Sequence, residues 1–240
     1  MRALLFIAAV VGVISHLTVR AQAPGTQVAG SDVNFSGVYA GARTIIEPDV
    51  YPFTETGERA QRAYDPLVGD PRQVDDCAPE SMPAILWAGT LNTMQIILGD
   101  ETIVMRLEHG GTVRSIHMDG SMPPTGQPHT ELGYSMGRWS ENVLTVETTH
   151  LTGGVVFTSR GYPVSPETHL TERYWREAGE DTLQMELLID DPVNYTQPVK
   201  LGREWLWSPD EQVLPWNCVS LGPRDSEPDI DALRRLLNQQ

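Results

Sequence analysis

The chain has 240 residues, of which 17 are Lys or Arg and 32 are Asp or Glu, so its formal net charge is −15 at neutral pH. A surplus of negative charge repels nucleic-acid phosphates and anionic membrane surfaces, and we therefore expect no nucleic-acid partner. The length fits one domain with a sizeable hydrophobic core.

The first 23 residues have the pattern of a secretory signal peptide. Arg2 precedes an apolar run over residues 3–14, and the small-residue site Ala21-Gln22-Ala23 follows. The run is shorter than the ~20 apolar residues of a membrane-spanning helix, so we expect cleavage after Ala23 and no membrane insertion. Cleavage also removes Arg20, leaving 15 basic residues against 32 acidic ones and a net charge of −17. The sequence thus predicts a periplasmic or secreted protein.

The mature chain begins with a short polar segment and then reads as one domain. Residues 24–31 are small and polar, which predicts a flexible lead-in, and residues 32–240 form the expected single domain. A first strand is expected from Asn34 to Ile46. Residues 54–64 combine a potential N-cap with good helix formers, which predicts a short helix. Residues 65–83 are rich in Pro, Asp and Gly and predict an irregular loop.

After Pro83 the hydrophobic pattern changes to a period of two, interrupted every eight to twelve residues by turn signals. This pattern is typical of an antiparallel sandwich or barrel in which neighbours in sequence are neighbours in the sheet. Tight turns are expected at 98–101, 109–111 and 140–142. Strands are expected near residues 84–89, 92–98, 102–108, 112–118, 132–138, 142–149, 168–176, 182–189 and 199–207.

Alternation within these strands separates an apolar face from a polar one. Ile103, Met105 and Leu107 share one face, as do Leu144 and Val146. With the first strand, eight to ten strands are enough to close a barrel that is either filled by side chains or wide enough for one small ligand. Residues 229–237 carry leucines at helical spacing and predict a C-terminal helix.

Two cysteines remain in the mature chain, Cys77 and Cys218. An oxidising compartment favours a disulfide between them. A free-thiol nucleophile is the alternative, but neither cysteine has a neighbouring cysteine or histidine in sequence to activate it.

Several sequence blocks together resemble a family of uncharacterised secreted bacterial proteins that look like lipocalin-type barrels. The blocks are residues 34–39, 114–120, 133–139 with 143–149, 172–174 and 191–198, and they span most of the mature chain. The opening Gly37-Val38-Tyr39 is similar to the Gly-x-Trp motif of lipocalins, with Tyr in place of Trp. The resemblance implies a lipocalin-like barrel and carries no reaction with it.

The mature histidines show no local metal-binding motif. His109, His117, His129, His150 and His169 include no pair at i, i+2 or i, i+4. A metal site would need histidines from separate strands, and three of them lie on or just after expected strands: His117, His150 and His169. His109 lies in a Gly-Gly turn and is expected to be exposed. We predict no metal site and no cofactor.

The best acid/base constellation is His117 with Asp119, followed by Tyr134 and Glu172. His117 and Asp119 share a strand face, and a histidine oriented by a carboxylate can move a proton at neutral pH. The competing interpretation makes Asp119-Gly120 a turn and Glu172-Arg173 a structural ion pair at the rim of the barrel.

The sequence Gly133-Tyr134-Ser135-Met136-Gly137 matches the Gly-x-Ser-x-Gly nucleophile motif. That motif functions on a strand-to-helix turn, whereas a strand is expected here, so close backbone approach or a bulge explains the glycines better. No glycine-rich phosphate loop precedes a helix, which argues against a nucleotide cofactor. Trp205 and Trp207 share a strand face and belong either to the core or to the mouth of a pocket.

Three functions follow from these features. The leading hypothesis is an exported lipocalin-like barrel that binds a small, largely apolar or amphipathic molecule in its interior. The second is a cofactor-independent isomerase, cyclase or lyase in which His117, Asp119, Tyr134 and Glu172 transfer protons. The third is a structural envelope module with a filled barrel. Polar and aromatic candidates for holding a ligand are Arg114, Arg138, His150, His169, Trp205 and Trp207.

Overall fold

The computed structural model describes residues 35–66, 77, 79–87, 93–177, 179–219 and 235. The expected signal peptide and lead-in, and all but one residue of the expected C-terminal helix, lie outside the described residues. No helix in the described part combines the length and apolarity needed to cross a bilayer.

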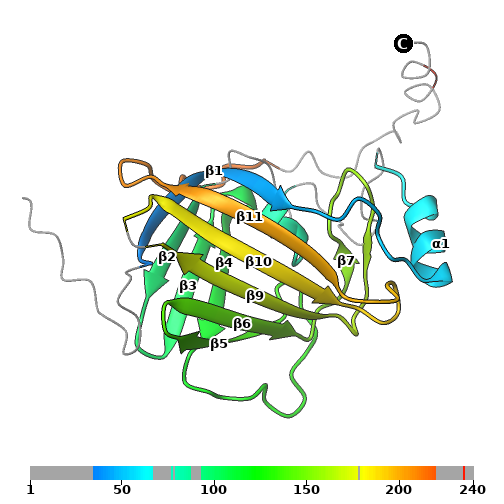
Figure 1. Cartoon of the computed structure of the whole chain (residues 1–240), viewed down its shortest axis with the longest axis horizontal. Helices are drawn as coiled ribbons and strands as arrows, with labels where there is room; N and C mark the ends of the chain where they lie inside the picture. Colours follow the sequence, from blue (N-terminus) through cyan, green and yellow to red (C-terminus); the bar gives the residue numbers. More distant parts are fainter. Residues whose placement is uncertain are drawn as a thin grey trace, which may run out of the picture.

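Nine strands form a closed barrel in the order β1-β11-β10-β9-β6-β5-β4-β3-β2 (Figure 1). A separate two-stranded sheet, β7 (Gly154–Val155) with β8 (Pro163–Val164), was not expected from the sequence and lies beside one end of the barrel near α1 (Figure 1). The barrel strands are β1 (Gly37–Ile46), β2 (Met94–Leu98), β3 (Thr102–Leu107), β4 (Thr112–His117), β5 (Tyr134–Ser140), β6 (Val143–Thr149), β9 (His169–Arg176), β10 (Thr182–Asp190) and β11 (Val199–Trp207).

The barrel is mixed, which corrects the expectation of a purely antiparallel sheet. β4 and β5 run parallel, and their register contains only Ile116↔Ser135 and His117↔Met136. Parallel neighbours need a crossover connection rather than a tight hairpin, and the loop 118–133 supplies it. The three tight turns predicted from sequence do join antiparallel neighbours: β2 to β3, β3 to β4 and β5 to β6.

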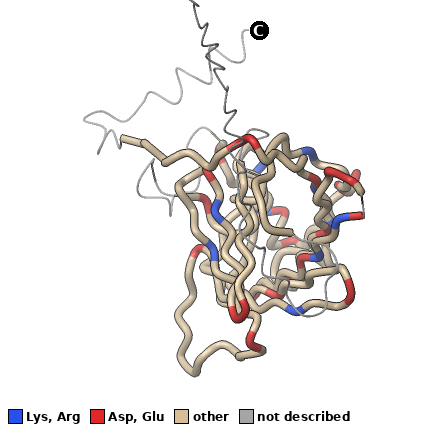
Figure 2. Tube along the Cα trace, turned by 90° about the vertical axis from the view of Figure 1, so that its left-hand side faces the viewer, with Lys and Arg blue, Asp and Glu red and all other residues tan. Residues whose placement is uncertain are grey.

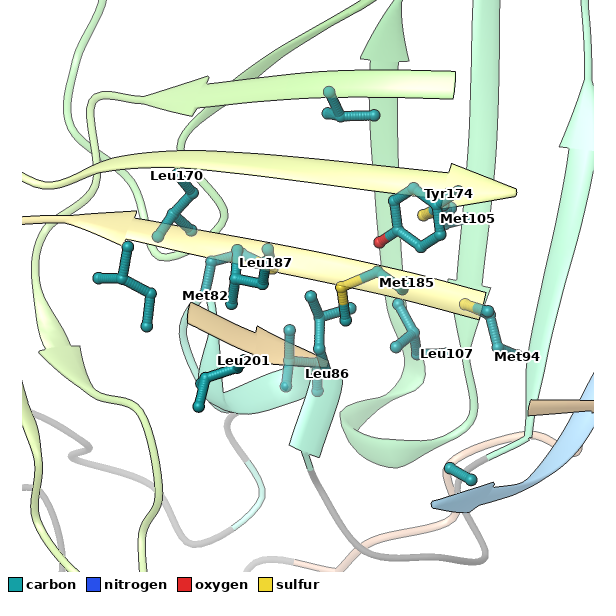
Figure 3. Close-up of a cluster of buried hydrophobic side chains, with 14 of the residues drawn as sticks. Met82, Leu86, Met94, Met105, Leu107, Leu170, Tyr174, Met185, Leu187 and Leu201 are labelled. Carbon is teal, nitrogen blue, oxygen red and sulfur yellow. The ribbon is translucent and has the colours of Figure 1, made fainter. Parts of the chain in front are cut away.

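The inner face of the barrel is packed with apolar side chains, as the alternation predicted. Ile103, Met105 and Leu107 on β3 are buried, and so are Leu144 and Val146 on β6. Figure 3 shows part of this cluster, with side chains from several strands meeting between the two sides of the barrel. Acidic and basic residues are interspersed over the barrel rather than gathered on one face (Figure 2).

The expected strand at 84–89 is wrong, because Ala84–Trp87 forms a single turn of 3-10 helix, η1. Ala84, Ile85 and Leu86 are all buried, although they are consecutive in sequence. A strand would expose every second side chain to the opposite face, whereas a tight helical turn lets consecutive apolar side chains enter one core.

The short helix predicted at 54–64 is confirmed as α1 (Glu55–Ala63). The Thr54 hydroxyl accepts a hydrogen bond from the Gly57 N–H at 3.0 Å, which caps the first turn. A second short helix, η2 (His109–Gly111), occupies the turn between β3 and β4.

The predicted disulfide between Cys77 and Cys218 is present, with the two Cα atoms 5.7 Å apart. The bond joins the loop before η1 to the segment after β11, and these cysteines are 141 residues apart in sequence. The segment after the last barrel strand is therefore linked covalently to the connection between β1 and β2.

Candidate functional site

A pocket of about 380 Å³ opens in the barrel wall beside the short parallel seam between β4 and β5. The ladder between these strands is limited to two register pairs, so residues just before β5 face β4 without strand pairing. The pocket lies where the pairing between β4 and β5 is missing. Its lining residues are Arg114, Ser115, His117, Gln127, Thr130, Leu132, Gly133, Tyr134 and Ser135.

The floor of the pocket belongs to a buried polar cluster that we define as Arg114, Ser135, Thr148, Glu172 and Tyr174. Arg114 donates two hydrogen bonds of 2.7 Å to Glu172, one from Nη1 to Oε2 and one from Nη2 to Oε1. Both side chains are withdrawn from water, with exposed fractions of 1% and 0%. This parallel, two-bond geometry is the strongest form of an arginine–carboxylate contact.

Hydroxyl groups complete the cluster on both sides of the ion pair. Arg114 Nη2 donates to Thr148 Oγ1 at 2.8 Å, and Arg114 Nε donates to Ser135 Oγ at 3.1 Å. On the other side, the Tyr174 hydroxyl donates to Glu172 Oε2 at 2.6 Å. These residues come from β4, β5, β6 and β9, which are consecutive neighbours in the barrel.

The contact with Glu172 keeps the guanidinium of Arg114 charged in spite of its burial. Burial by itself lowers the pKa of Arg114, but the adjacent Glu172 carboxylate outweighs this effect and the pKa is raised. Burial, reinforced by the charge of Glu172, raises the pKa of Tyr174 well above its ordinary value. The cluster therefore holds a protonated guanidinium and a neutral phenol that donates to the carboxylate.

His117 and Tyr134 lie on the outer face of the barrel at the pocket, where their rings stack with centroids 4.5 Å apart and planes within 9°. The Tyr134 hydroxyl lies 3.2 Å from Ser121 Oγ in the connecting loop. This pair gives the pocket a flat aromatic edge.

The two carboxylates proposed to orient His117 do not do so through a hydrogen bond within the described residues. Asp119 is exposed, and its Oδ1 accepts from the Ser121 N–H at 3.0 Å. Hydrogen bonds from Ser121 lower the pKa of Asp119, and the charge of His117 contributes in the same direction. Glu172 projects from the inner face, on the side of the sheet opposite to His117, and contacts Arg114.

The alternative of a rim ion pair between Glu172 and Arg173 is wrong. Adjacent residues of a strand point to opposite faces, so the two side chains diverge. Glu172 enters the interior and pairs with Arg114 from another strand.

The other ligand-holding candidates lie away from the pocket lining. Arg138 is on the outer face and pairs with Glu147 at 2.7 Å, while His169 is exposed at the start of β9. Trp205 is buried in the core, and Trp207 packs edge-on against Tyr39 with centroids 5.4 Å apart. His150 follows β6, and its ring lies 5.4 Å from that of His129.

The two glycines of the Gly-x-Ser-x-Gly sequence serve close packing, as expected. Gly133 has a φ of +67°, and a Cβ there would lie 2.4 Å from the carbonyl oxygen of Thr149. A Cβ at Gly137 would lie 2.4 Å from the sulfur of Met118. Ser135 between them faces Arg114 on the inside of the barrel.

Sequence reasoning missed Ser135 and Thr148 as partners of Arg114, and Tyr174 as a partner of Glu172. Strand alternation contained the signal, because it places Arg114, Ser135, Thr148 and Glu172 on inward positions of four strands. The adjacency of those strands was the missing information.

A second buried arginine, Arg203 on β11, was also missed. Its Nη1 donates to the Leu86 carbonyl of η1 at 2.5 Å, and burial lowers its pKa to about 10. The contact links the 3-10 turn to the barrel wall.

His109 differs from its expected exposure. Its ring packs against Trp216 with centroids 5.0 Å apart, and burial lowers its pKa. The segment after β11 thus covers the turn between β3 and β4.

Comparison with protein-family models gives no match for this sequence, and comparison with curated proteins gives none.

Proposed function

We propose that this protein is an exported, lipocalin-like barrel that binds a small amphipathic molecule in the pocket between β4 and β5. The observation that carries the proposal is the combination of a ready-formed pocket with a rigid, charge-paired floor. Binding pockets typically join apolar walls with a few fixed polar groups, and this pocket has both. The disulfide and the sequence pattern of a signal peptide support export.

The lining favours a neutral ligand with one flat face. The positive charge of Arg114 is balanced by Glu172, so the floor offers hydrogen bonding without an unpaired charge. Leu132 and the stacked rings of His117 and Tyr134 supply apolar and aromatic surface, while Ser115, Gln127 and Thr130 supply polar groups at the walls.

We propose a site in the wall of the barrel rather than in its interior. In the barrel interior, Arg114 of β4 pairs with Glu172 of β9. Met105 is the cross-strand partner of Arg114, Met185 is the cross-strand partner of Tyr174, and both methionines are fully buried. A molecule at the seam would contact this cluster from the outside.

Native mass spectrometry of the mature protein, purified from the compartment into which its host exports it, tests the proposal. We expect a stoichiometric small molecule that organic extraction releases. Ser115 is exposed and lines the pocket, so Ser115→Tyr should obstruct the pocket and remove the bound mass. Val113→Tyr is the matched control, because Val113 is exposed on the same strand and face but does not line the pocket.

Retention of the molecule by Ser115→Tyr at the level of Val113→Tyr would contradict the proposed site. If the exported protein carries no molecule and the extracts of its compartment restore none, small-molecule carriage is wrong. The structural envelope module then becomes the better account.

A proton-transfer reaction is the second candidate, because His117 and Tyr134 both line the pocket. Histidine is the side chain best suited to exchange a proton near neutral pH. Turnover of the extracted compound, lost in His117→Gln while binding is retained, would support an enzyme. Equal binding and no turnover in either protein would leave carriage as the function.

A further inference from the structure

Next to the pocket, the fold brings together two histidines that the sequence leaves 21 positions apart. His129 lies in the loop before β5, and His150 directly follows β6. Their ring centroids are 5.4 Å apart, with an angle of 53° between the rings. Two imidazoles bound to one tetrahedral ion through nitrogen at ~2.0–2.1 Å have centroids about 5 Å apart, so the observed spacing suits a shared ion.

The backbone holds these histidines in register. Thr130 and Leu151 form an isolated parallel bridge, and the Thr130 N–H donates to the His150 carbonyl at 2.9 Å. The Thr152 N–H donates to the Thr130 carbonyl at 3.1 Å. His129 and His150 are thus carried by two segments that are fixed to each other.

Both rings are also anchored through Nδ1. His129 Nδ1 lies 2.7 Å from the Leu151 carbonyl oxygen, and because a carbonyl only accepts, this nitrogen carries the proton. The neutral ring then has its lone pair on Nε2. His150 Nδ1 lies 2.9 Å from Thr149 Oγ1. Metal-binding histidines are commonly oriented in this way, with the second ring nitrogen hydrogen-bonded to a backbone carbonyl or another polar group.

The backbone conformation of His150 provides a fourth observation. His150 has a φ of +59°, a left-handed conformation that side-chain-bearing residues seldom adopt. Unfavourable backbone conformations concentrate at functional sites, where surrounding structure maintains them. Here Thr149, His150 and Thr152 all make the hydrogen bonds that maintain it.

We propose that His129 and His150 form a binding site for a divalent transition-metal ion of the Zn²⁺ class. Imidazole nitrogen suits Zn²⁺, Ni²⁺ and Cu²⁺, whereas Mg²⁺ and Ca²⁺ prefer oxygen. Within the described residues, no group of three or more His, Cys, Asp or Glu side chains is arranged to hold an ion, so water completes the coordination shell. Because His129 is exposed, the ion has access from solvent.

The site would brace one wall of the pocket. Thr130 lines the pocket and is bridged to Leu151, and these two residues directly follow His129 and His150 in the chain. A metal ion joining His129 and His150 adds a second link between the same segments. The metal site does not depend on the identity of any pocket ligand.

Titration of the untagged mature protein with ZnCl₂, followed by isothermal calorimetry, tests the proposal. We expect one saturable Zn²⁺ site for which Mg²⁺ does not compete. Acid should weaken Zn²⁺ binding, because an imidazolium has no lone pair for a metal. His129→Asn keeps a donor near the Leu151 carbonyl, and His150→Asn tolerates the left-handed backbone. Each should weaken Zn²⁺ binding at least ~10-fold.

His169→Asn is the matched control, because His169 is exposed on β9 and should leave Zn²⁺ binding unchanged. Near-ultraviolet circular dichroism checks that each variant is folded. Unchanged affinity in both Asn variants, an equal loss in the control, or no saturable binding below ~1 mM would overturn the proposal.

A measurement on the unmodified protein covers the case in which a variant fails to fold. In ¹⁵N spectra of the imidazoles, Zn²⁺ should shift the Nε2 resonances of His129 and His150 selectively. Shifts confined to other histidines would overturn the site.

Discussion

At the scale of single residues, the main feature is a fully buried ion pair whose groups are all satisfied locally. Arg114 and Glu172 share two 2.7 Å hydrogen bonds, and Ser135, Thr148 and Tyr174 satisfy further positions around them. Removing one partner of such a pair strongly destabilises the folded protein, because the other charge stays buried without a partner or water to solvate it. The cluster therefore fixes the geometry of the pocket floor.

We predict that Arg114→Met or Glu172→Leu alone lowers the free energy of unfolding by about 3–5 kcal/mol. The double variant should lose much less than the sum, since it leaves no unpaired charge. Arg138→Met, which breaks the exposed pair with Glu147, is the control and should cost under about 1 kcal/mol. Urea unfolding measures all four, and additive losses for Arg114 and Glu172 would contradict the coupling.

The partial burial of His109 predicts that the folded protein loses stability in acid. Burial lowers the pKa of His109 below its ordinary value of 6.5, so below that pH the unfolded chain binds more protons than the folded one. The contribution of His109 to stability is complete above pH 6.5 and is lost as the pH falls through its lowered pKa. His109→Phe should reduce the loss of unfolding free energy on acidification, and an identical pH profile in both proteins would show that His109 does not contribute.

At the scale of elements, the parallel contact between β4 and β5 creates the site. Alternation after Pro83 predicted eight of the nine barrel strands, because inward apolar positions recur with a period of two. The ninth, β1, was predicted separately from the segment that begins at Asn34. The parallel pairing was not predictable, since alternation assigns faces but not strand direction or neighbours. The strand predicted at 84–89 was wrong for a related reason, because a continuous apolar run fits either a strand or a helical turn.

Because alternation does not reveal which strands are neighbours, only part of the candidate site could be predicted from the sequence. Arg114, His117 and Tyr134 were identified as candidates and do line one pocket, whereas Arg138, His169 and Trp205 lie elsewhere. Residue type marked all six equally. Only the pairing order of the strands separates those that converge from those that do not.

Gly133 provides a test of the seam. Gly133 and Gly126 both have positive φ, +67° and +81°, but only Gly133 has close neighbours, whereas a Cβ at Gly126 meets nothing within 4 Å. Gly126→Ala should cost only the backbone strain of about 1–2 kcal/mol. Gly133→Ala should cost clearly more, because its Cβ would clash with the Thr149 carbonyl. Equal thermal shifts in the two variants would show that the close approach at the seam is unimportant.

At the scale of the whole molecule, the barrel is closed by strand pairing and then tied by one covalent link. The Cys77–Cys218 disulfide spans 141 residues and connects the loop between α1 and η1 to the segment after β11, the last barrel strand. In the chain-entropy model, a loop of this size restricts the unfolded chain by about 5 kcal/mol. Its stabilising effect belongs to the molecule as a whole rather than to one element.

We predict that the Cys77→Ala, Cys218→Ala double variant loses up to about 5 kcal/mol of unfolding free energy while its far-ultraviolet circular dichroism is retained. Reductant should destabilise the unmodified protein by a similar amount and leave the double variant unaffected. Denaturation with and without reductant makes this comparison. Equal stability of the oxidised protein and the double variant would mean that the disulfide does not constrain the unfolded chain.

The central claim is that the pocket at the β4–β5 seam holds a small molecule, and a crystal structure of the protein as isolated from its own host tests it most directly. We predict difference density beside the stacked rings of His117 and Tyr134, within hydrogen-bonding distance of Ser135 or Arg114. Density for a stoichiometric bound molecule at any other place in the barrel, with this pocket filled only by water, would contradict the account.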